Sequence, residues 1–256
     1  MRITALTENT SRRGLPTEHG LSLYIETNGI KLLFDSGQSG LFAENAERLG
    51  VDLSTVDTAV LSHGHYDHGG GLKRFLELNR TAKVYMNRCA FEPHYNGDKY
   101  IGLDTELQGS DRLVMTHGVT PIGNGMTLDD CGGRERVIDP GSSGLSTERD
   151  GKRIPEDFRH EHCLLIEENG RRFLLSGCSH RGILNIVEWF RPDVLIGGFH
   201  FMKLPLDETL ADHAKRLDSY DTVYYTCHCT GEAQYAFMKP YMRRLNYLSC
   251  GDTIEI

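Results

Sequence analysis

The chain contains the same strand-turn-strand pattern twice, and this repeat constrains its fold more than any other feature of the sequence. The copies span residues 21–35 and 163–176, and each turns at an Asn-Gly pair, which readily adopts the positive φ angles of a type I′ turn. Shifted by 141 positions, the copies are identical at Leu23/Leu164, Ile25/Ile166, Glu26/Glu167, Asn28/Asn169, Gly29/Gly170 and Leu33/Leu174. Since a helix and another strand follow in both copies, an internal duplication is the simplest account.

Two β-β-α-β halves of this kind predict a sandwich of two sheets. The helices expected at residues 40–49 and 183–190 each cover one face of a sheet. The remaining apolar faces are buried if the two sheets pack against each other with the helices outside. We therefore expect an α/β fold, a four-layer αβ/βα sandwich, formed by residues 1–256 as a single domain.

Residues 87–159 separate the two halves and show no sustained apolar periodicity. They contain turn-prone stretches such as Pro-Gly-Ser-Ser-Gly at 140–144, and they are too long for an ordinary connection. We expect this region to be an irregular insertion that faces the substrate, and not a separate domain.

Four potential metal ligands lie within six residues, directly after the strand-like run 58–61. The sequence from 61 to 71 reads Leu-Ser-His-Gly-His-Tyr-Asp-His-Gly-Gly-Gly, and its candidate ligands are His63, His65, Asp67 and His68. Imidazole nitrogens and a carboxylate suit zinc and related transition metals, and the glycines allow a short loop to direct several side chains to one point. A His-rich surface turn would need neither the interleaved aspartate nor the preceding strand.

Histidines after later strands are the natural source of further ligands, because they project from the same sheet edge as His63. The three histidines in such positions are His180, His200 and His228. We predict His180 and His228 as metal ligands and His200, the repeat partner of His63, as a proton donor or substrate contact. Asp35 could fix the tautomer of a ligand imidazole or simply cap its turn.

The composition narrows the classes of partner. The net charge is −8, and Lys and Arg occur in runs no longer than pairs, so a nucleic-acid partner is disfavoured. The sequence has no signal-peptide pattern and no apolar stretch of bilayer length, which favours a soluble protein without a membrane partner. Seven scattered cysteines, an odd number, fit free thiols in the cytoplasm.

The pattern H-x-H-x-D-H at 63–68 resembles the signature of the metallo-β-lactamase superfamily. Other motifs narrow the resemblance to the branch that includes the 7,8-dihydropterin-6-methyl-4-(β-D-ribofuranosyl)aminobenzene-5′-phosphate synthases. These motifs are Glu-His-Gly-Leu-Ser at 18–22, Asp-Phe-x-His-Glu at 157–161, Gly-Cys-Ser-His-Arg-Gly-Ile at 177–183, Gly-Phe-His at 198–200 and Cys-His-Cys-Thr-Gly at 227–231. They cover nearly the whole chain, and they are specific for the branch but not for one reaction.

The resemblance implies a site of two Zn²⁺ ions, with Mn or Fe as alternatives. His63 and His65 would serve the first metal, Asp67 and His68 the second, and His228 matches the last histidine of the superfamily. The family's bridging aspartate is missing here, because Cys178 occupies its position and His180 follows two residues later. Cys178 therefore stays an alternative ligand to His180, as do His160 and His162, which precede the second hairpin.

The function implied is that of a metal-dependent enzyme acting on a phosphorylated small molecule. One reading is a transferase that uses a dihydropterin diphosphate, with Asp67 and His200 as catalytic residues and with Arg12, Arg13, Arg153, Arg159 or Arg181 binding phosphate. The alternative is a phosphodiesterase, esterase or lactonase that uses a metal-bound hydroxide. A flavodiiron-like protein would need a flavin domain, and retention of the ligands argues against a descendant that only binds. The sequence leaves the oligomeric state open.

Overall fold

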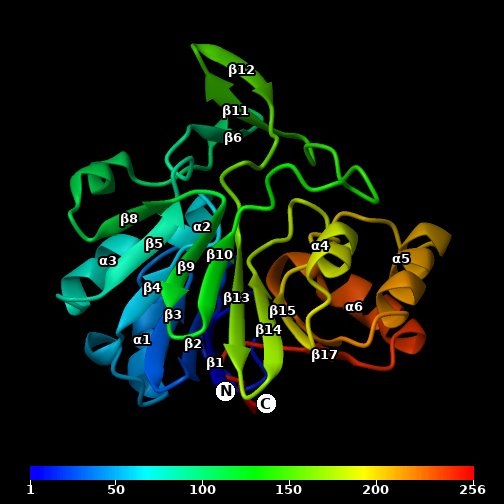
Figure 1. Cartoon of the computed structure of the whole chain (residues 1–256), viewed down its shortest axis with the longest axis horizontal. Helices are drawn as coiled ribbons and strands as arrows, with labels where there is room; N and C mark the ends of the chain where they lie inside the picture. The colour runs from blue at the N-terminus through cyan, green and yellow to red at the C-terminus, as the bar shows by residue number, and fades with distance from the viewer.

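Two seven-stranded sheets pack face to face in the computed structural model, which describes residues 1–256 (Figure 1). The first sheet, in spatial order, contains β18 (Thr253–Glu255), β1 (Arg2–Thr7), β2 (Ser22–Thr27), β3 (Ile30–Phe34), β4 (Thr58–Val60), β5 (Lys83–Asn87) and β8 (Leu113–Thr116). The second contains β17 (Leu245–Tyr247), β16 (Val223–Thr226), β15 (Val194–Gly197), β14 (Arg171–Ser176), β13 (Cys163–Glu168), β10 (Met126–Asp129) and β9 (Val119–Gly123).

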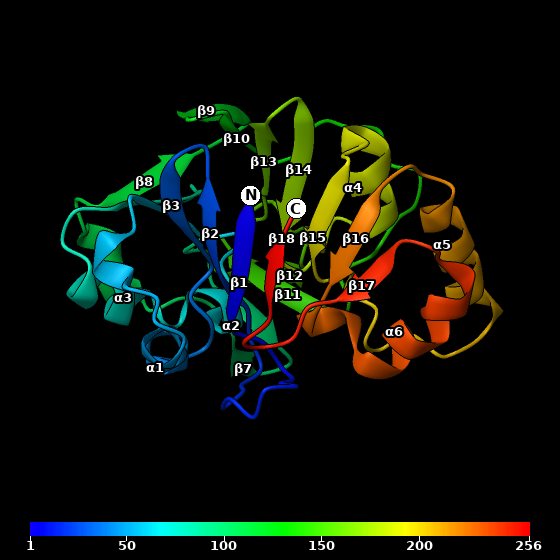
Figure 2. The same ribbon diagram turned by 90° about the horizontal axis from the view of Figure 1, so that it is seen from below.

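The strand directions of the two sheets are the same, which supports the duplication. In each sheet three antiparallel pairs are followed by three parallel pairs. The two Asn-Gly hairpins, β2–β3 and β13–β14, occupy equivalent places in this order. The final strand β18 crosses to the first sheet and pairs with β1, so the two chain ends lie together (Figure 2).

Helices cover the outer face of each sheet and complete four layers, which confirms the predicted αβ/βα sandwich. The helices are α1 (Leu41–Arg48), α2 (Tyr66–Gly69), α3 (Leu72–Leu78), α4 (Ile183–Phe190), α5 (Glu208–Asp218) and α6 (Glu232–Met238). Short 3₁₀ turns are η1 (Leu53–Thr55), η2 (Thr105–Gly109), η3 (His228–Thr230) and η4 (Lys239–Tyr241). No helix has both the length and the apolar character needed to cross a membrane.

Three apolar clusters correspond to the three interfaces between the layers. Phe34 of the first sheet and Phe173 of the second belong to the cluster between the sheets. Phe42 and Phe75 pack α1 and α3 on the first sheet, and Ile186 belongs to the cluster under α4, α5 and α6. Each such side chain contributes roughly 1.5–3 kcal/mol through burial, so the sandwich is a rigid support for its edges.

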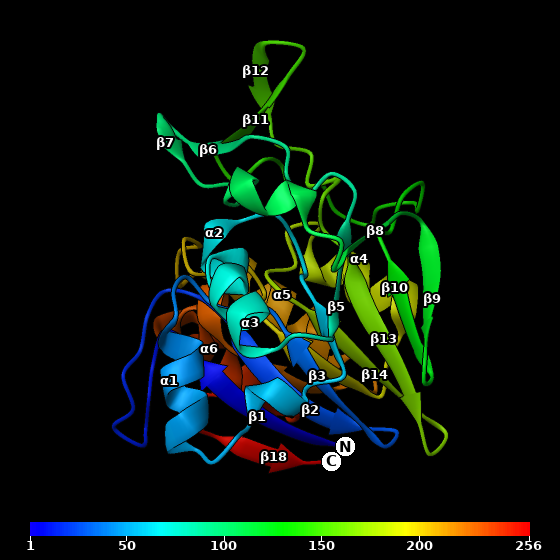
Figure 3. The ribbon, with the colours of Figure 1, turned by 90° about the vertical axis from the view of Figure 1, so that its left-hand side faces the viewer.

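Residues 87–159 divide between the sandwich and a projecting sheet, which differs from one irregular insertion. β8, β9 and β10 extend the two main sheets. Four further short strands form a separate sheet, here called the lid sheet: β6 (His94–Asn96), β7 (Lys99–Tyr100), β11 (Leu145–Arg149) and β12 (Lys152–Pro155). It projects above the end of the sandwich where α2 lies (Figures 1 and 3). Residues 156–162, here called the return segment, lead from it back to β13.

Candidate metal centre

The histidine-rich loop lies at one end of the sandwich because β4 ends there. His63 and Gly64 follow β4, and the one-turn helix α2 carries Asp67 and His68. A Cβ on Gly64 would lie 2.1 Å from the carbonyl oxygen of Ala90, so only glycine permits this close approach. The loop is thereby folded tightly enough to turn alternate side chains toward one region.

Asp35, at the end of β3, fixes both the loop and one of its histidines. Its Oδ1 accepts from the backbone N–H of Ser62 at 2.7 Å, and its Oδ2 accepts from Nδ1 of His68 at 2.7 Å. This confirms the predicted contact between Asp35 and a loop imidazole. Because the carboxylate takes the Nδ1 proton, Nε2 of His68 presents a lone pair.

A first group of three histidines consists of His63, His65 and His180, which offer ring nitrogens within 4.8 Å of one another. Nε2 of His63, Nε2 of His65 and both ring nitrogens of His180 are buried without a hydrogen-bond partner. Burial lowers the pKa of all three, that of His65 to about 3, so the rings are neutral at neutral pH. Neutral imidazole is the form that binds a metal, and a cation would satisfy these unpaired atoms.

A second group consists of Asp67, His68 and His228. Oδ2 of Asp67 lies 3.4 Å from Nε2 of His228 and 3.8 Å from Nε2 of His68, and the two Nε2 atoms are 3.2 Å apart. Nδ1 of His228 donates to Oδ1 of Asn9 at 2.8 Å, so its Nε2 also presents a lone pair. Three acceptor atoms therefore face one another, and a cation bound between them would offset their mutual repulsion.

The electrostatics of the second group point the same way. Burial alone would raise the pKa of Asp67, but His68, His19 and His228 hold it well below its ordinary value, so Asp67 is ionised. Burial also lowers the pKa of His68, yet Asp35 and Asp67 outweigh it and raise that pKa. The negative surroundings that favour a proton on His68 equally favour a metal cation.

The alternative ligands have other partners. Nε2 of His162 donates to the carbonyl oxygen of Leu61 at 2.8 Å, and Nδ1 of His160 accepts from the N–H of Gly64 at 2.8 Å. Both histidines are buried and tie the second half of the chain to the metal loop. Neither presents a free lone pair to the two groups, and neither is a solvated residue.

Cys178 lies beside the second group, whereas His180 belongs to the first. The Cys178 sulfur lies 3.2 Å from Nε2 of His68, and it forms a further cluster with His228 and Cys229. Burial raises the pKa of the Cys178 thiol well above its ordinary value, so in this state it is protonated and donates to His68.

His200 lies beside the first group and takes part in neither cluster. Its ring centroid is 4.3 Å from that of His180, and its Nδ1 is 3.3 Å from Oγ of Ser143. Its φ of 58° is rare for a residue with a side chain. Burial, followed by Lys203, lowers its pKa to about 4, so the ring is neutral and contacts neighbours by hydrogen bonding.

His19 lies over the second group with its side chain 45% exposed, and its Nε2 is 3.2 Å from Oδ2 of Asp67. Nδ2 of Asn9 donates to Nδ1 of His19 at 3.2 Å, so the Nε2 proton of His19 points at Asp67. His19 therefore holds Asp67 from the solvent side.

Four supporting residues were not identified from the sequence. Asn9 and Glu8 follow β1, and Glu8 accepts from the N–H of His228 at 2.5 Å. Their position after a strand of the first sheet is a signal that could have identified them. His94 and Glu156, paired at 2.7 Å in the lid region, have no such signal because 61 residues of irregular sequence separate them.

Comparisons with known proteins agree with this geometry. The model of the metallo-β-lactamase superfamily matches residues 15–225. An uncharacterized protein of Methanocaldococcus jannaschii is 31% identical over 238 residues, covering 90% of each chain. The 7,8-dihydropterin-6-methyl-4-(β-D-ribofuranosyl)-aminobenzene-5′-phosphate synthase of the same organism is 26% identical, covering 100% of this chain and 96% of its own.

A solved structure is similar along the whole length of the chain. The crystal structure of Tm1679, described as a metal-dependent hydrolase of the β-lactamase superfamily, is 30% identical with a TM-score of 0.82 and covers 100% of this chain and 99% of its own. Proteins of this fold are generally enzymes that bind metal ions, typically zinc. The sandwich, the H-x-H-x-D-H loop and the family match lead to one conclusion: this chain belongs to the metallo-β-lactamase superfamily.

Proposed function

We propose that the two groups bind two metal ions. His63, His65 and His180 would hold the first, and Asp67, His68 and His228 would hold the second. The observation that carries this proposal is the pair of Nε2 lone pairs on His68 and His228, 3.2 Å apart beside an ionised carboxylate. A donor set of imidazoles and a carboxylate favours zinc, with Mn or Fe as alternatives.

We further propose that the enzyme acts on a phosphorylated small molecule as a transferase. In this reaction the nitrogen of a ribosylated aryl amine phosphate bonds to the methylene carbon of a dihydropterin diphosphate. The bond from that carbon to oxygen breaks, diphosphate leaves with the electron pair, and the nitrogen loses a proton. Bound metals would supply Lewis acidity to the leaving oxygens.

The whole-length similarity to a protein named as the corresponding synthase supports this reaction. The enclosure of the centre supports it as well. Phe158 of the return segment is buried and stacks on His180 with a centroid distance of 4.4 Å, and Ser143 covers His200. Exclusion of water favours transfer to an amine, because water would otherwise compete for the same carbon.

His200 and Asp67 would have different catalytic roles. Neutral His200 is placed beside the first group to contact the substrate by a hydrogen bond, which fits a positioning contact better than donation of a proton by an imidazolium. Ionised Asp67 would balance the charge of the second group while His19 holds its orientation.

Among the arginines expected to bind phosphate, Arg181 fits best. Arg13, Arg153 and Arg159 form ion pairs with Asp252, Asp98 and Glu92. Arg181 is buried, its Nε has no hydrogen-bond partner, and its guanidinium forms no ion pair. A buried guanidinium without an acceptor would gain most from an anionic group of the substrate.

Hydrolysis is the second candidate, and a specific observation favours it. The solved structure that is 30% identical to this chain is described as a metal-dependent hydrolase. In that case the same residues would bind a phosphodiester, ester or lactone, and His200 would contact its leaving group.

The test compares metal-loaded protein with chelator-treated protein on three substrates. The dihydropterin diphosphate with the aryl amine phosphate is followed by mass spectrometry and diphosphate release; bis-p-nitrophenyl phosphate and a lactone are followed by absorbance. Metal-dependent condensation of the pair, with diphosphate released in equal amount, is the result expected of the transferase. Turnover of an ester or lactone alone would assign a hydrolase, and no turnover with metal bound would contradict both.

A further inference from the structure

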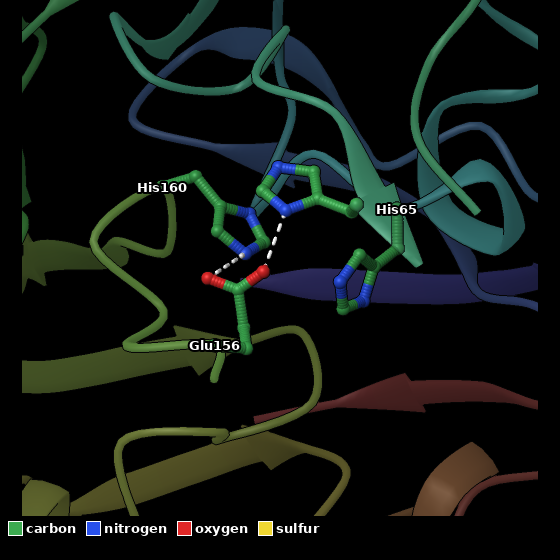
Figure 4. A group of neighbouring side chains, drawn as sticks. His65, Glu156 and His160 are labelled. Carbon is green, nitrogen blue, oxygen red and sulfur yellow. Dashed lines mark hydrogen bonds and ion pairs between the residues drawn. The ribbon is translucent and has the colours of Figure 1, made fainter. Parts of the chain in front are cut away.

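Four buried side chains form a separate cluster where the lid meets the metal loop (Figure 4). His94 comes from β6 of the lid sheet, Glu156 and His160 come from the return segment, and His65 comes from the metal loop. One ring nitrogen of each histidine and one oxygen of Glu156 lie within 4.8 Å of one another. The superfamily match and the proposed chemistry assign no role to His94 and Glu156.

The hydrogen bonds of Glu156 determine how His94 is protonated. Oε1 of Glu156 accepts from the backbone N–H groups of Asp157 and Phe158, each at 3.1 Å, and Oε2 lies 2.7 Å from Nδ1 of His94. Because a carboxylate only accepts, the proton between them is on Nδ1 of His94. Nε2 of His94 therefore keeps a lone pair, and it is buried without a partner.

The protonation of His160 argues against a further metal ion in this cluster. Its Nδ1 accepts from the N–H of Gly64 at 2.8 Å, so its ring proton is on Nε2. That Nε2 lies 3.8 Å from Oε1 of Glu156. A neutral His160 thus directs a proton, and not a lone pair, into the cluster.

His65 links this cluster to the proposed metal centre. One ring nitrogen of His65 lies within 4.8 Å of a ring nitrogen of His94 and an oxygen of Glu156, and Figure 4 shows the other ring nitrogen pointing away from Glu156. A metal-binding imidazole keeps its proton on the nitrogen that does not bind the metal, and that N–H is normally held by an acceptor. The acceptors on this side of His65 are Glu156 and the lone pair of His94.

We infer that the Glu156–His94 pair orients His65 as a metal ligand by accepting a hydrogen bond from its ring N–H. The inference rests on the proposed metal centre. Its consequence is that residues of the lid region, distant in sequence from His65, set the affinity of the first metal.

The experiment measures metal content and affinity in Glu156→Gln. The Gln oxygen would accept from the two backbone N–H groups, so its amide N–H would point at Nδ1 of His94. His94 would then carry its proton on Nε2, where wild type has a lone pair. We expect one of the two metals to bind about 10- to 100-fold more weakly in a chelator competition, with the other unchanged. His94→Phe, which keeps a ring of similar size and removes both nitrogens, should weaken the same metal.

The matched control is Asp157→Asn, next in sequence to Glu156 and paired with Arg149 away from the cluster. It should leave both affinities unchanged. Melting of the metal-free proteins separates a loss of folding from a loss of positioning, and the absorption spectrum of the Co²⁺ form should change in Glu156→Gln but not in Asp157→Asn.

Three results would overturn the inference. These are equal affinities in wild type and Glu156→Gln, equal weakening by Asp157→Asn, and a third equivalent of metal that both cluster variants lose. If wild type binds no metal at all, the proposed function fails together with the inference. If wild type binds two metals and the variants bind both with the same affinities as wild type, only the inference fails.

Discussion

The two halves of the sandwich have the same order and direction of strands, but they supply the candidate metal centre in different ways. The first half concentrates four candidate ligands in one loop after β4. The second half places one histidine after each of three parallel strands, namely His180 after β14, His200 after β15 and His228 after β16. The duplicated fold thus provides two sets of strand ends. The first half supplies its candidate ligands from one loop, and the second half supplies single residues after three strands.

The supporting residues differ between the halves as well. Asp35, after β3, bonds both Ser62 and His68. Ser176, its counterpart 141 residues later at the end of β14, bonds only the hydroxyl of Ser179 at 2.9 Å. At this pair of positions the first half therefore has a charged support, whereas the second half has a neutral link within its own loop.

The largest effect is expected when the repeat partners His63 and His200 are changed separately. His63→Gln should remove a metal equivalent and lower activity by more than the ~100-fold that outer-shell changes cost, because it removes a direct ligand. His200→Gln should lower activity by about 10²-fold while both metals stay bound, because it removes a contact that positions the substrate. Bound metal is measured by mass spectrometry and turnover is measured under identical conditions for both variants. Equal metal loss in both would contradict the division of roles.

A second comparison uses the counterparts Asp35 and Ser176. Asp35→Asn should weaken metal binding by about 10- to 100-fold, since the amide no longer fixes the tautomer of His68. Ser176→Ala should change metal affinity little, because its hydroxyl contacts no candidate ligand. Calorimetric titration of metal-free protein is the measurement, and a similar loss from both substitutions would show that the two supports are equivalent.

These contrasts also show how far the sequence alone leads. Asn-Gly pairs and apolar runs predicted both hairpins, and residues 183–190 form a helix as expected, because local turn chemistry and periodicity decide those elements. Helix α6 ends at Met238 because Pro240, two residues later, cannot continue it. β17 was not predicted, because it is only three residues long.

The lid sheet could not be predicted, because its strands are two to five residues long and depend on distant partners. Leu145 of β11, for example, pairs with Asn96 of β6. The candidate ligands were accessible from the motif and from strand ends, but the tautomers of His228 and His68 depend on Asn9 and Asp35 in the folded protein. Sequence patterns contain no information about such contacts.

The smallest expected effect is a difference in pH-dependent stability between the lid sheet and the sandwich. The hydrogen bond from Arg149 holds the pKa of Asp157 below its ordinary value. Burial alone would raise the pKa of Glu92, but Arg159 and Arg149 outweigh burial and lower that pKa. A carboxyl group whose pKa is lower in the folded state stabilises that state when the pH is above the group's ordinary pKa, which is 3.8 for Asp and 4.5 for Glu. This stabilisation is lost as the pH falls below those values. Partly exposed pairs of this kind contribute at most about 1 kcal/mol each.

We therefore expect peptic cleavage within residues 145–162 to increase between pH 5 and pH 3, about the range in which these groups gain protons, before cleavage of the sandwich. Arg149→Gln should shift the onset of lid cleavage to higher pH. Simultaneous cleavage of lid and sandwich at every pH would contradict the separation of the two regions.

The most direct test of the central claim is an anomalous scattering map of metal-loaded crystals at the absorption edge of the metal. The account predicts two peaks, one among the ring nitrogens of His63, His65 and His180 and one among Asp67, His68 and His228. A loaded crystal with no peak at either group, or with metal bound only elsewhere, would contradict the claim that ligands from both halves converge on shared cations.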